Sequence, residues 1–254
     1  MSRAIFRPAI RAANWVLARK PRFVVIGTPR SGTTYFSKLC RANGVICSHE
    51  DYFTEHGPML RNPARRFDVQ GDVSWLAPPF LPDKDIVAVH QVRHPLPVIR
   101  SIVEIGLFDP RREHTRKPFV DMVRRYFDFS DDPLRSALRF YIEWNLRCEK
   151  VTDKRYRIED IDNIHDKLSE WLGIRLVNTA STSRTTNRRP AEIDDTWDLG
   201  KLMSLPEYPM LQVLANRYGY NLQAVADVEK EAVSAAGKEA ASGTDRLLKR
   251  KSAV

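Results

Sequence analysis

Short apolar runs alternate along this chain with longer segments whose apolar residues recur at helical spacing. Residues 23–26 and 86–89 are continuous apolar runs of strand length, which are typical of strands buried on both faces of a parallel sheet. Residues 33–42 carry their large apolar side chains on one helical face. This alternation predicts an α/β fold, a single three-layer domain in which helices flank a central parallel sheet. Further helices are predicted over 95–105, 134–151, 160–171 and 207–217, and further short strands over 45–47 and 156–158.

The pattern also predicts where single residues lie. Asp160 is expected to cap the helix that begins there, and Gly173 to end it. Residues 107–133, rich in arginine, aspartate and aromatic residues, are expected to be irregular. Tyr141 and Trp144 are expected to lie in the core rather than to stack on a ligand.

By composition the chain divides into three parts. Residues 1–22 form a basic arm with six Lys or Arg and no acidic residue, predicted to be a short amphipathic helix over 3–20. Residues 23–223 are expected to form the domain, and residues 224–254 a polar helical or disordered tail. The arm has two interpretations. Packing on the domain is favoured because Pro8 interrupts a narrow apolar face, and peripheral contact with a membrane surface is the alternative.

Composition and charge exclude several classes of protein. The 254 residues include 5 Trp, 11 Phe and 8 Tyr, which is too much aromatic side chain for a disordered chain. The net charge of +9, from 41 basic and 32 acidic residues, is carried mostly by the N-terminal arm. Nucleic-acid-binding domains carry their basic excess on the folded part. No nucleic-acid partner is therefore predicted.

Cysteine usage and hydropathy bear on location. Cys40, Cys47 and Cys148 are odd in number and form no Cys-x-x-Cys pair, so neither a disulfide framework nor a zinc site is indicated. No run approaches the roughly 20 apolar residues of a membrane-spanning helix. Arg3 and Arg7 interrupt the region where a signal peptide needs an apolar core. A cytoplasmic protein is expected, with membrane association through the arm as the alternative.

A glycine-containing turn, residues 27–34, joins the first predicted strand to the first predicted helix. Its sequence Gly-Thr-Pro-Arg-Ser-Gly-Thr-Thr has the two glycines and the final Thr34 of a phosphate-binding P-loop, but Thr33 takes the place of the lysine. Arg30, inside the loop, supplies a cation instead. Backbone N–H groups at a helix N-terminus favour an oxyanion, so the turn predicts an oxyanion site rather than an ordinary connection.

The strand that begins at residue 86 ends differently from that of a metal-dependent P-loop enzyme. A kinase or NTPase usually has an aspartate there to hold Mg²⁺, whereas this strand ends in Arg93. Arginine grips a phosphate with two parallel hydrogen bonds. The pattern favours transfer from an anionic donor without a metal. His90 and His94 are four residues apart but straddle a strand end, so they are not expected to bind a metal.

Four segments together resemble the sulfotransferases that use 3′-phosphoadenosine 5′-phosphosulfate (PAPS). Residues 29–34 resemble their 5′-phosphosulfate loop, in the arginine form common among bacterial members. Residues 93–95 (Arg-His-Pro), followed by Ser101, resemble their 3′-phosphate motif. Residues 157–161 (Arg-Ile-Glu-Asp-Ile) are similar to their Tyr-Glu-Asp-Leu segment, with isoleucine in the tyrosine place. Residues 71–74 (Gly-Asp-Val-Ser) loosely match a Gly-Glu-x-Ser/Thr-Pro segment and lack its proline.

The resemblance implies a single P-loop-type α/β domain that binds PAPS, releases 3′-phosphoadenosine 5′-phosphate (PAP) and needs no metal. It implies transfer of a sulfuryl group to a hydroxyl, with an amine as the second choice, of a small molecule or a glycan. Arg30 is expected to act in catalysis as well as in binding. Asp72 and Ser74 are implicated at the acceptor site, whose walls are expected from the segments 52–80 and 107–133. The residues implicated in donor binding are Pro29, Arg30, Ser31, Gly32, Thr33, Thr34, Arg93, Ser101 and, in a polar loop over 178–198, Arg188.

The block over 49–53 resembles the segment that supplies the catalytic base in several sulfotransferase branches. Glu50 is expected to be the base, with His49 as the alternative. If the segment stays extended, His49 and Asp51 point to the side opposite to Glu50. Tyr52 and Phe53 are expected to exclude water and to raise the pKa of Glu50.

Two other functions stay open on the residues alone. One is a metal-dependent P-loop kinase, which the missing lysine and the missing strand-end acid disfavour. The other is a module that binds a nucleotide without chemistry. Such a module would bind PAPS but never convert it to PAP.

Overall fold

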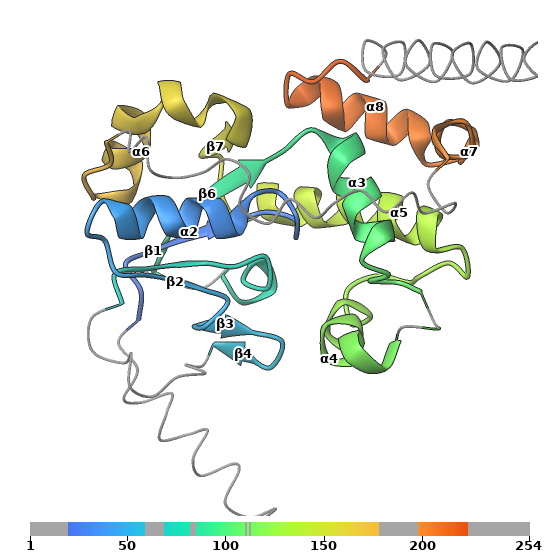
Figure 1. The fold of residues 1–254 in the computed structure, drawn as a ribbon, viewed down its shortest axis with the longest axis horizontal. Coiled ribbons are helices and arrows are strands. Elements are labelled where there is room, and N and C mark those ends of the chain that lie inside the picture. The colour runs from blue at the N-terminus through green and yellow to red at the C-terminus, as the bar shows by residue number, and fades with distance from the viewer. Residues whose placement is uncertain are drawn as a thin grey trace, which may run out of the picture. The chain divides into compact units, whose positions relative to one another are not determined.

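The computed structural model describes residues 20–58, 69–81, 85–109, 111, 113–177 and 198–222 (Figure 1). The predicted arm helix, apart from residue 20, lies outside these residues. The same holds for the predicted tail over 224–254 and for residues 178–197 of the polar loop.

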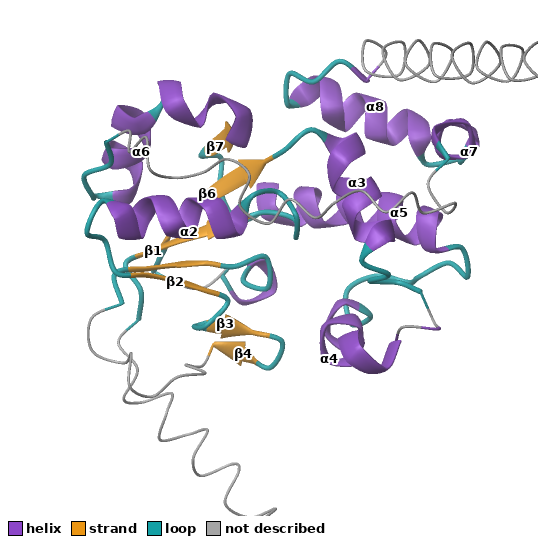
Figure 2. Ribbon diagram, viewed as in Figure 1, coloured by secondary structure: helices purple, strands orange, loops and turns teal. Residues whose placement is uncertain are grey.

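Five parallel strands form the central sheet (Figure 2), in the order β2-β5-β1-β6-β7. The predicted α/β fold with a central parallel sheet is therefore confirmed. A separate antiparallel hairpin, β3 (Phe53–Thr54) and β4 (Gly57–Pro58), follows β2 in the chain. The strand expected over 45–47 starts two residues later than predicted. The strands of the sheet are β1 (Phe23–Ile26), β2 (Cys47–His49), β5 (Gly71–Val73), β6 (Val87–Val92) and β7 (Arg155–Arg157).

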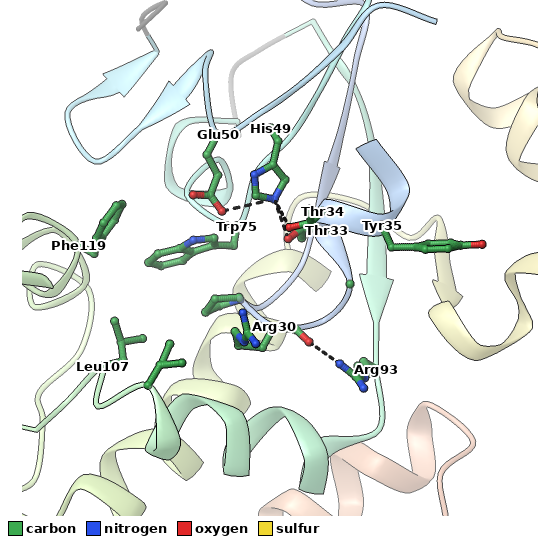
Figure 3. Close-up of a pocket in the computed structure, with 13 residues that line it drawn as sticks. Arg30, Thr33, Thr34, Tyr35, His49, Glu50, Trp75, Arg93, Leu107 and Phe119 are labelled. Carbon is green, nitrogen blue, oxygen red and sulfur yellow. Dashed lines mark hydrogen bonds and ion pairs between the residues drawn. The ribbon is translucent and has the colours of Figure 1, made fainter. Parts of the chain in front are cut away.

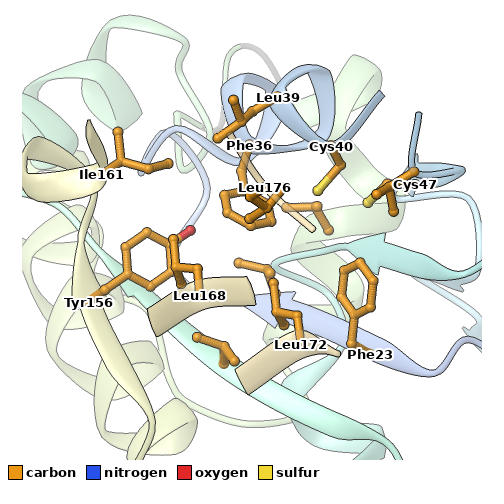
Figure 4. Packing of buried hydrophobic residues seen from close by; sticks show 14 residues of the cluster. Phe23, Phe36, Leu39, Cys40, Cys47, Tyr156, Ile161, Leu168, Leu172 and Leu176 are labelled. Atoms are coloured by element: carbon orange, nitrogen blue, oxygen red, sulfur yellow. The ribbon is translucent and has the colours of Figure 1, made fainter. Parts of the chain in front are cut away.

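One face of the sheet is covered by α2 (Thr33–Ala42) and α6 (His165–Leu172). Side chains along a strand alternate between the two faces, and those on this face form one buried cluster with the helices (Figure 4). Burial of each large apolar side chain contributes roughly 1.5–3 kcal/mol, so this layer holds α2 and the loop that precedes it. The cluster includes Phe23, Val25, Val73 and Val89 from the sheet and Phe36, Leu39, Leu168 and Leu172 from the helices.

The opposite face packs against α5 (Pro133–Glu149), which in turn packs against α3 (Pro95–Glu104). His90 of β6 points to this side, where its Nε2 lies 2.9 Å from Oδ1 of Asn145 on α5. Tyr141 and Trp144 of α5 are buried, as predicted. The domain therefore has the three predicted layers.

Two helical segments differ from the prediction. Residues Glu113–Val123 form α4 within the segment that was expected to be irregular. Val120, Met122 and Val123 are buried, and packing of such an apolar face stabilises a helix more than intrinsic propensity does.

The prediction that Asp160 caps a helix was wrong. A 3₁₀ segment, η4 (Ile158–Asn163), comes first, and α6 begins only at His165. Asp160 instead pairs with Arg157, whose Nε lies 2.6 Å from its Oδ2. Gly173 ends α6 with a φ of 63°, as predicted.

The chain divides into two compact units, residues 1–211 and 212–254, with the boundary inside α8 (Tyr208–Arg217). All of the site described below belongs to the first unit. Cys40, Cys47 and Cys148 are buried and free. In the part of the chain that the structure describes, no helix has both the length and the apolar character to cross a membrane. The other helical elements are η2 (Pro78–Phe80) and α7 (Leu199–Ser204).

Candidate active site

A pocket of about 270 Å³ lies at the carboxyl ends of β1, β2 and β6 (Figure 3). This edge is where open parallel sheets bind their ligands. The loop over 27–34 follows β1, His49 ends β2 and Arg93 follows β6, so the sheet brings together three segments that are distant in sequence. The pocket is lined by Pro29, Arg30, Gly32, Thr33, Thr34, Tyr35, His49, Glu50, Trp75, Arg93, Ile105, Leu107 and Phe119.

The loop is held against β6 at its first glycine. A Cβ atom added at Gly27 would collide with the backbone oxygen of Gln91, so the close approach requires glycine. Gln91 also donates from Nε2 to the backbone oxygen of Ser31 at 2.8 Å. Gly32, with a φ of 99°, is the N-cap residue of α2, and no described side chain caps that helix. The helix therefore offers its first N–H groups and its positive dipole end to an anion in the pocket.

Five of the six predicted loop residues line the pocket, and Ser31 is the exception. Its side chain is fully buried and donates from Oγ to the backbone oxygen of Thr28 at 2.7 Å. The Ser31 hydroxyl thus shapes the loop rather than facing a ligand.

The cation of the loop is the side chain of Arg30, whose backbone has a left-handed conformation with a φ of 70°. That conformation costs a non-glycine residue roughly 1–2 kcal/mol, and two hydrogen bonds hold the residue there. Arg30 Nε donates to Ser101 Oγ on α3 at 2.8 Å, and Arg93 Nη1 donates to the Arg30 backbone oxygen at 3.0 Å. The loop that resembles the 5′-phosphosulfate loop and the motif of Arg93 and Ser101 therefore meet at Arg30.

Arg93 is positioned through its main chain. Its backbone oxygen accepts a 2.7 Å hydrogen bond from the hydroxyl of Tyr141, which is buried in α5. The backbone N–H of the next residue donates to Glu159 Oε1 at 3.1 Å. Ile158 lies over the loop, since a Cβ added at Gly32 would come within 3.0 Å of its Cγ1. The segment that resembles Tyr-Glu-Asp-Leu therefore borders both anion-binding motifs.

His49 and Glu50 both point into the pocket (Figure 3). Strand β2 ends at His49, and Glu50, with a φ of 56°, leaves the extended conformation. His49 Nε2 lies 3.8 Å from Glu50 Oε1 and 3.0 Å from Thr33 Oγ1. The prediction that the two side chains lie on opposite sides was wrong, because it required the strand to continue through Glu50.

The structure gives different information on the two candidate bases, the charge of His49 and the exposure of Glu50. Burial, reinforced by the nearby Arg41, lowers the pKa of His49 to about 4, so its imidazole is neutral at neutral pH. The Glu50 side chain is 20% exposed. Tyr52 and Phe53, which were expected to shield Glu50, do not belong to the residues that line the pocket.

Asp72 and Ser74, which were expected to contact the acceptor, are instead fully buried. Asp72 Oδ1 accepts a 2.7 Å hydrogen bond from Ser48 Oγ, and its Oδ2 accepts a 3.1 Å bond from the backbone N–H of Phe53. Ser74 Oγ donates to the backbone oxygen of Phe53 at 3.1 Å. Burial raises the pKa of Asp72 to about 6. These side chains hold the segment that carries the candidate base, because their polar atoms are already bonded to it.

An apolar wall faces the polar side chains of the pocket. It consists of Trp75, Ile105, Leu107 and Phe119, with the ring centroids of Trp75 and Phe119 separated by 6.0 Å. Three of the four fall in the two segments from which acceptor walls were predicted. The sequence did not single out these residues. The one available signal was the position of Trp75 directly after the fourth motif, since Phe119 lies on the helix that was not predicted.

Arg188 lies outside the described residues. Among the residues that the structure does describe, no three His, Cys, Asp or Glu side chains gather as a metal site would require.

The arrangement suits a ligand with two separate anionic groups beside an apolar body. The loop amides and Arg30 face one group, and Arg93 stands at the next strand end for another. Comparison of the sequence with models of known protein families finds no match, and comparison with curated proteins finds none either.

Proposed function

We propose that this protein is a PAPS-dependent sulfotransferase that transfers a sulfuryl group to a hydroxyl of a small molecule or a glycan, with an amine as the second choice. The observation that carries this proposal is the meeting of both motifs at Arg30, which bonds to Ser101 and to Arg93. A metal-dependent P-loop enzyme would need an acid at the end of β6, where this chain has Arg93.

The residues present fit the donor. Gly27 and Gly32 let the loop pack closely against Gln91 and Ile158, and the N-terminus of α2 beside it can offer backbone N–H groups to a phosphosulfate. Arg30 and the N-terminus of α2 would hold the 5′-phosphosulfate. Arg93 and Ser101 would hold the 3′-phosphate, the group that distinguishes PAPS from ordinary adenine nucleotides.

Six of the side chains that line the pocket have a chemical role in such a transfer. Bound PAPS supplies the sulfuryl group that the acceptor oxygen attacks. The guanidinium of Arg30 stabilises negative charge that develops beside the loop. Glu50 accepts the proton of the acceptor hydroxyl, and the neutral imidazole of His49 is the alternative acceptor of that proton. Trp75, Leu107 and Phe119 exclude water from the acceptor oxygen.

Turnover of PAPS tests the proposal. The purified protein is incubated with PAPS and a metabolite extract, PAP release is followed, and new sulfate esters are identified by mass spectrometry. The matched control is Arg30→Ala, which keeps the fold but loses the cation of the loop. Release of PAP that depends on the extract, the protein and Arg30 is expected. Tight binding of PAP with no turnover in any extract would favour the non-catalytic module.

A further inference from the structure

Three consecutive residues at one strand end hold both ends of the segment over 49–53. The backbone N–H of Glu50 donates to the Val73 oxygen at 3.1 Å. At the other end, the backbone N–H of Phe53 donates to Asp72 Oδ2 and the Phe53 oxygen accepts from Ser74 Oγ, each at 3.1 Å. We call Asp72, Val73 and Ser74 the β5 clamp.

Asp72 is the member of the β5 clamp whose burial is energetically unfavourable. Its carboxylate is completely buried, and burying a carboxylate is unfavourable unless hydrogen bonds compensate. The two oxygens have separate donors, the hydroxyl of Ser48 and the backbone N–H of Phe53. The side chain therefore joins β2, at Ser48, to the first residue of the β3–β4 hairpin, with the candidate base between these two contacts.

The β5 clamp acts on a strained piece of backbone. Glu50 has a φ of 56°, which lies in the left-handed region. A residue other than glycine stays in that region only when the surrounding structure imposes it. If the segment relaxed to an extended form, neighbouring side chains would alternate. His49 and Glu50 would then no longer face the same pocket.

We propose that Asp72 is a positioning residue for the candidate base. By fixing Phe53 relative to β2, it keeps His49 and Glu50 on the pocket side. Its effect on turnover rests on the proposed sulfotransferase function, whereas its effect on the surroundings of His49 does not.

Two substitutions separate hydrogen bonding from charge. Asp72→Val fills similar space but accepts no hydrogen bond, so the N–H of Phe53 must find another partner. Asp72→Asn is the conservative variant. Its amide oxygen can accept from Phe53 and its NH₂ can donate to Ser48, whose hydroxyl also lies 3.3 Å from the Gly71 oxygen.

The matched control is Thr54→Val. It removes a buried hydroxyl that donates to the Gly57 oxygen at 3.1 Å in the same hairpin, and it leaves the β5 clamp intact. Thermal unfolding shows whether its loss of stability is comparable with that of Asp72→Val. A general loss of stability would then affect both variants alike.

The first readout is the titration of the His49 imidazole by NMR, assigned with a His49→Asn variant. In Asp72→Val the pKa of His49 is expected to rise from about 4 toward its ordinary 6.5, because a displaced segment exposes the ring. In Asp72→Asn and Thr54→Val it should stay low. This readout needs neither donor nor acceptor.

The second readout is turnover of PAPS beside calorimetric binding of PAP. Asp72→Val is expected to lower kcat by about 10- to 100-fold, the scale of a misplaced catalytic group. PAP affinity should fall much less than kcat, since the β5 clamp reaches the donor-binding loop indirectly, through the hydrogen bond between His49 and Thr33. Asp72→Asn should restore most of kcat.

Each other result is also decisive. An unchanged His49 titration in a folded Asp72→Val protein overturns the positioning role, whatever the protein catalyses. Equal losses of kcat in Asp72→Asn and Asp72→Val would show that Asp72 acts through its charge instead.

If wild type turns over no PAPS while the titration shifts as expected, the proposed function fails and the positioning role stands. Should Asp72→Val not fold, Asp72→Ser takes its place, because the shorter side chain no longer reaches the N–H of Phe53, and an unchanged His49 titration there overturns the positioning role.

Discussion

Arg30 Nε donates a hydrogen bond to Ser101 Oγ at 2.8 Å across 71 residues of sequence. The serine accepts this bond, so its own proton is directed elsewhere, as a group that binds an anion requires. Arg93 bonds to the backbone of the same arginine. The cation of the loop and the groups assigned to the 3′-phosphate therefore form one connected unit, and a change in one should be felt by the others.

Donor specificity follows from this unit. PAP should bind more tightly than 5′-AMP, because the 3′-phosphate gains charge-assisted contacts worth about 1.5–3 kcal/mol, or roughly 10- to 150-fold. Arg93→Ala should remove most of this preference and lower 5′-AMP affinity to a smaller extent, since Arg30 loses its bond from Arg93 but keeps its bond to Ser101. Calorimetry with both nucleotides measures it, and equal affinities in wild type would contradict the assignment of Arg93 and Ser101.

Substitutions of Arg30 separate its charge from its conformation. Arg30→Ala and Arg30→Gly should both lower kcat by about 10²- to 10³-fold, the scale of one lost transition-state donor. Arg30→Lys should keep part of the activity. Since the φ of 70° favours glycine, Arg30→Gly should be more stable than Arg30→Ala by about 1 kcal/mol. Steady-state kinetics measure the first effect and urea unfolding measures the second. A wild-type kcat in Arg30→Ala would show that Arg30 is not the cation that stabilises the transition state.

The identity of the base is decided by three variants. Glu50→Gln keeps the shape of the side chain but removes its basicity, so it should keep PAP affinity and lose at least about 10²-fold in kcat. His49→Ala and Asp51→Asn should lose much less. If His49→Ala is inactive while Glu50→Gln is active, the histidine is the base that accepts the proton of the acceptor hydroxyl.

The raised pKa of Asp72 predicts how stability varies with pH. The folded pKa, about 6, lies above the ordinary 3.8, so folding favours the protonated form. The associated stabilisation is present below about pH 4 and is lost as the pH rises through about 6. Asp72→Asn lacks this loss, so its unfolding free energy relative to wild type should rise between pH 4 and 7 by up to roughly 3 kcal/mol.

Urea unfolding at several pH values measures this difference. The surface variant Asp153→Asn is the control, because it removes a carboxylate that is exposed. A constant difference between Asp72→Asn and wild type would mean that the Asp72 carboxyl is not desolvated in the folded protein.

Metal dependence separates the transferase from a kinase. Under the proposed function Arg30 and the loop amides serve in place of Mg²⁺, and the residue after β6 is Arg93 rather than an acid. Turnover of PAPS should therefore persist in EDTA. Activity that EDTA abolishes and Mg²⁺ restores, with ATP as donor, would support the kinase instead.

The parts of the site that the sequence predicted depend on local signals. Gly27 and Thr34 belong to one short loop, and β1 is a continuous apolar run whatever its neighbours are. The meeting of that loop with Arg93 follows from parallel topology, because the carboxyl ends of neighbouring strands share one edge. Neither inference required knowledge of side-chain contacts.

The parts that were missed depend on partners distant in the chain. The turn at Glu50 is imposed by bonds to Val73 and, through Phe53, to Asp72 on another strand. The sequence implicated Asp72 at the acceptor site, since only the fold reveals its buried hydrogen-bond donors. Helix α4 likewise depends on the burial of Val120, which sequence periodicity around Pro118 does not indicate.

Three of the four residues of the apolar wall come from chain that the sheet does not fix, whereas Trp75 closely follows β5. Ile105 and Leu107 follow α3, and Phe119 lies on α4. The anion-binding groups instead end β1 and β6, where Gly27 allows no side chain. Under the proposed function, selection can therefore exchange these three apolar residues while the residues proposed to bind the donor stay constant. A library randomised at these positions would sample new acceptors on an unchanged donor, which is how one scaffold diversifies into many specificities.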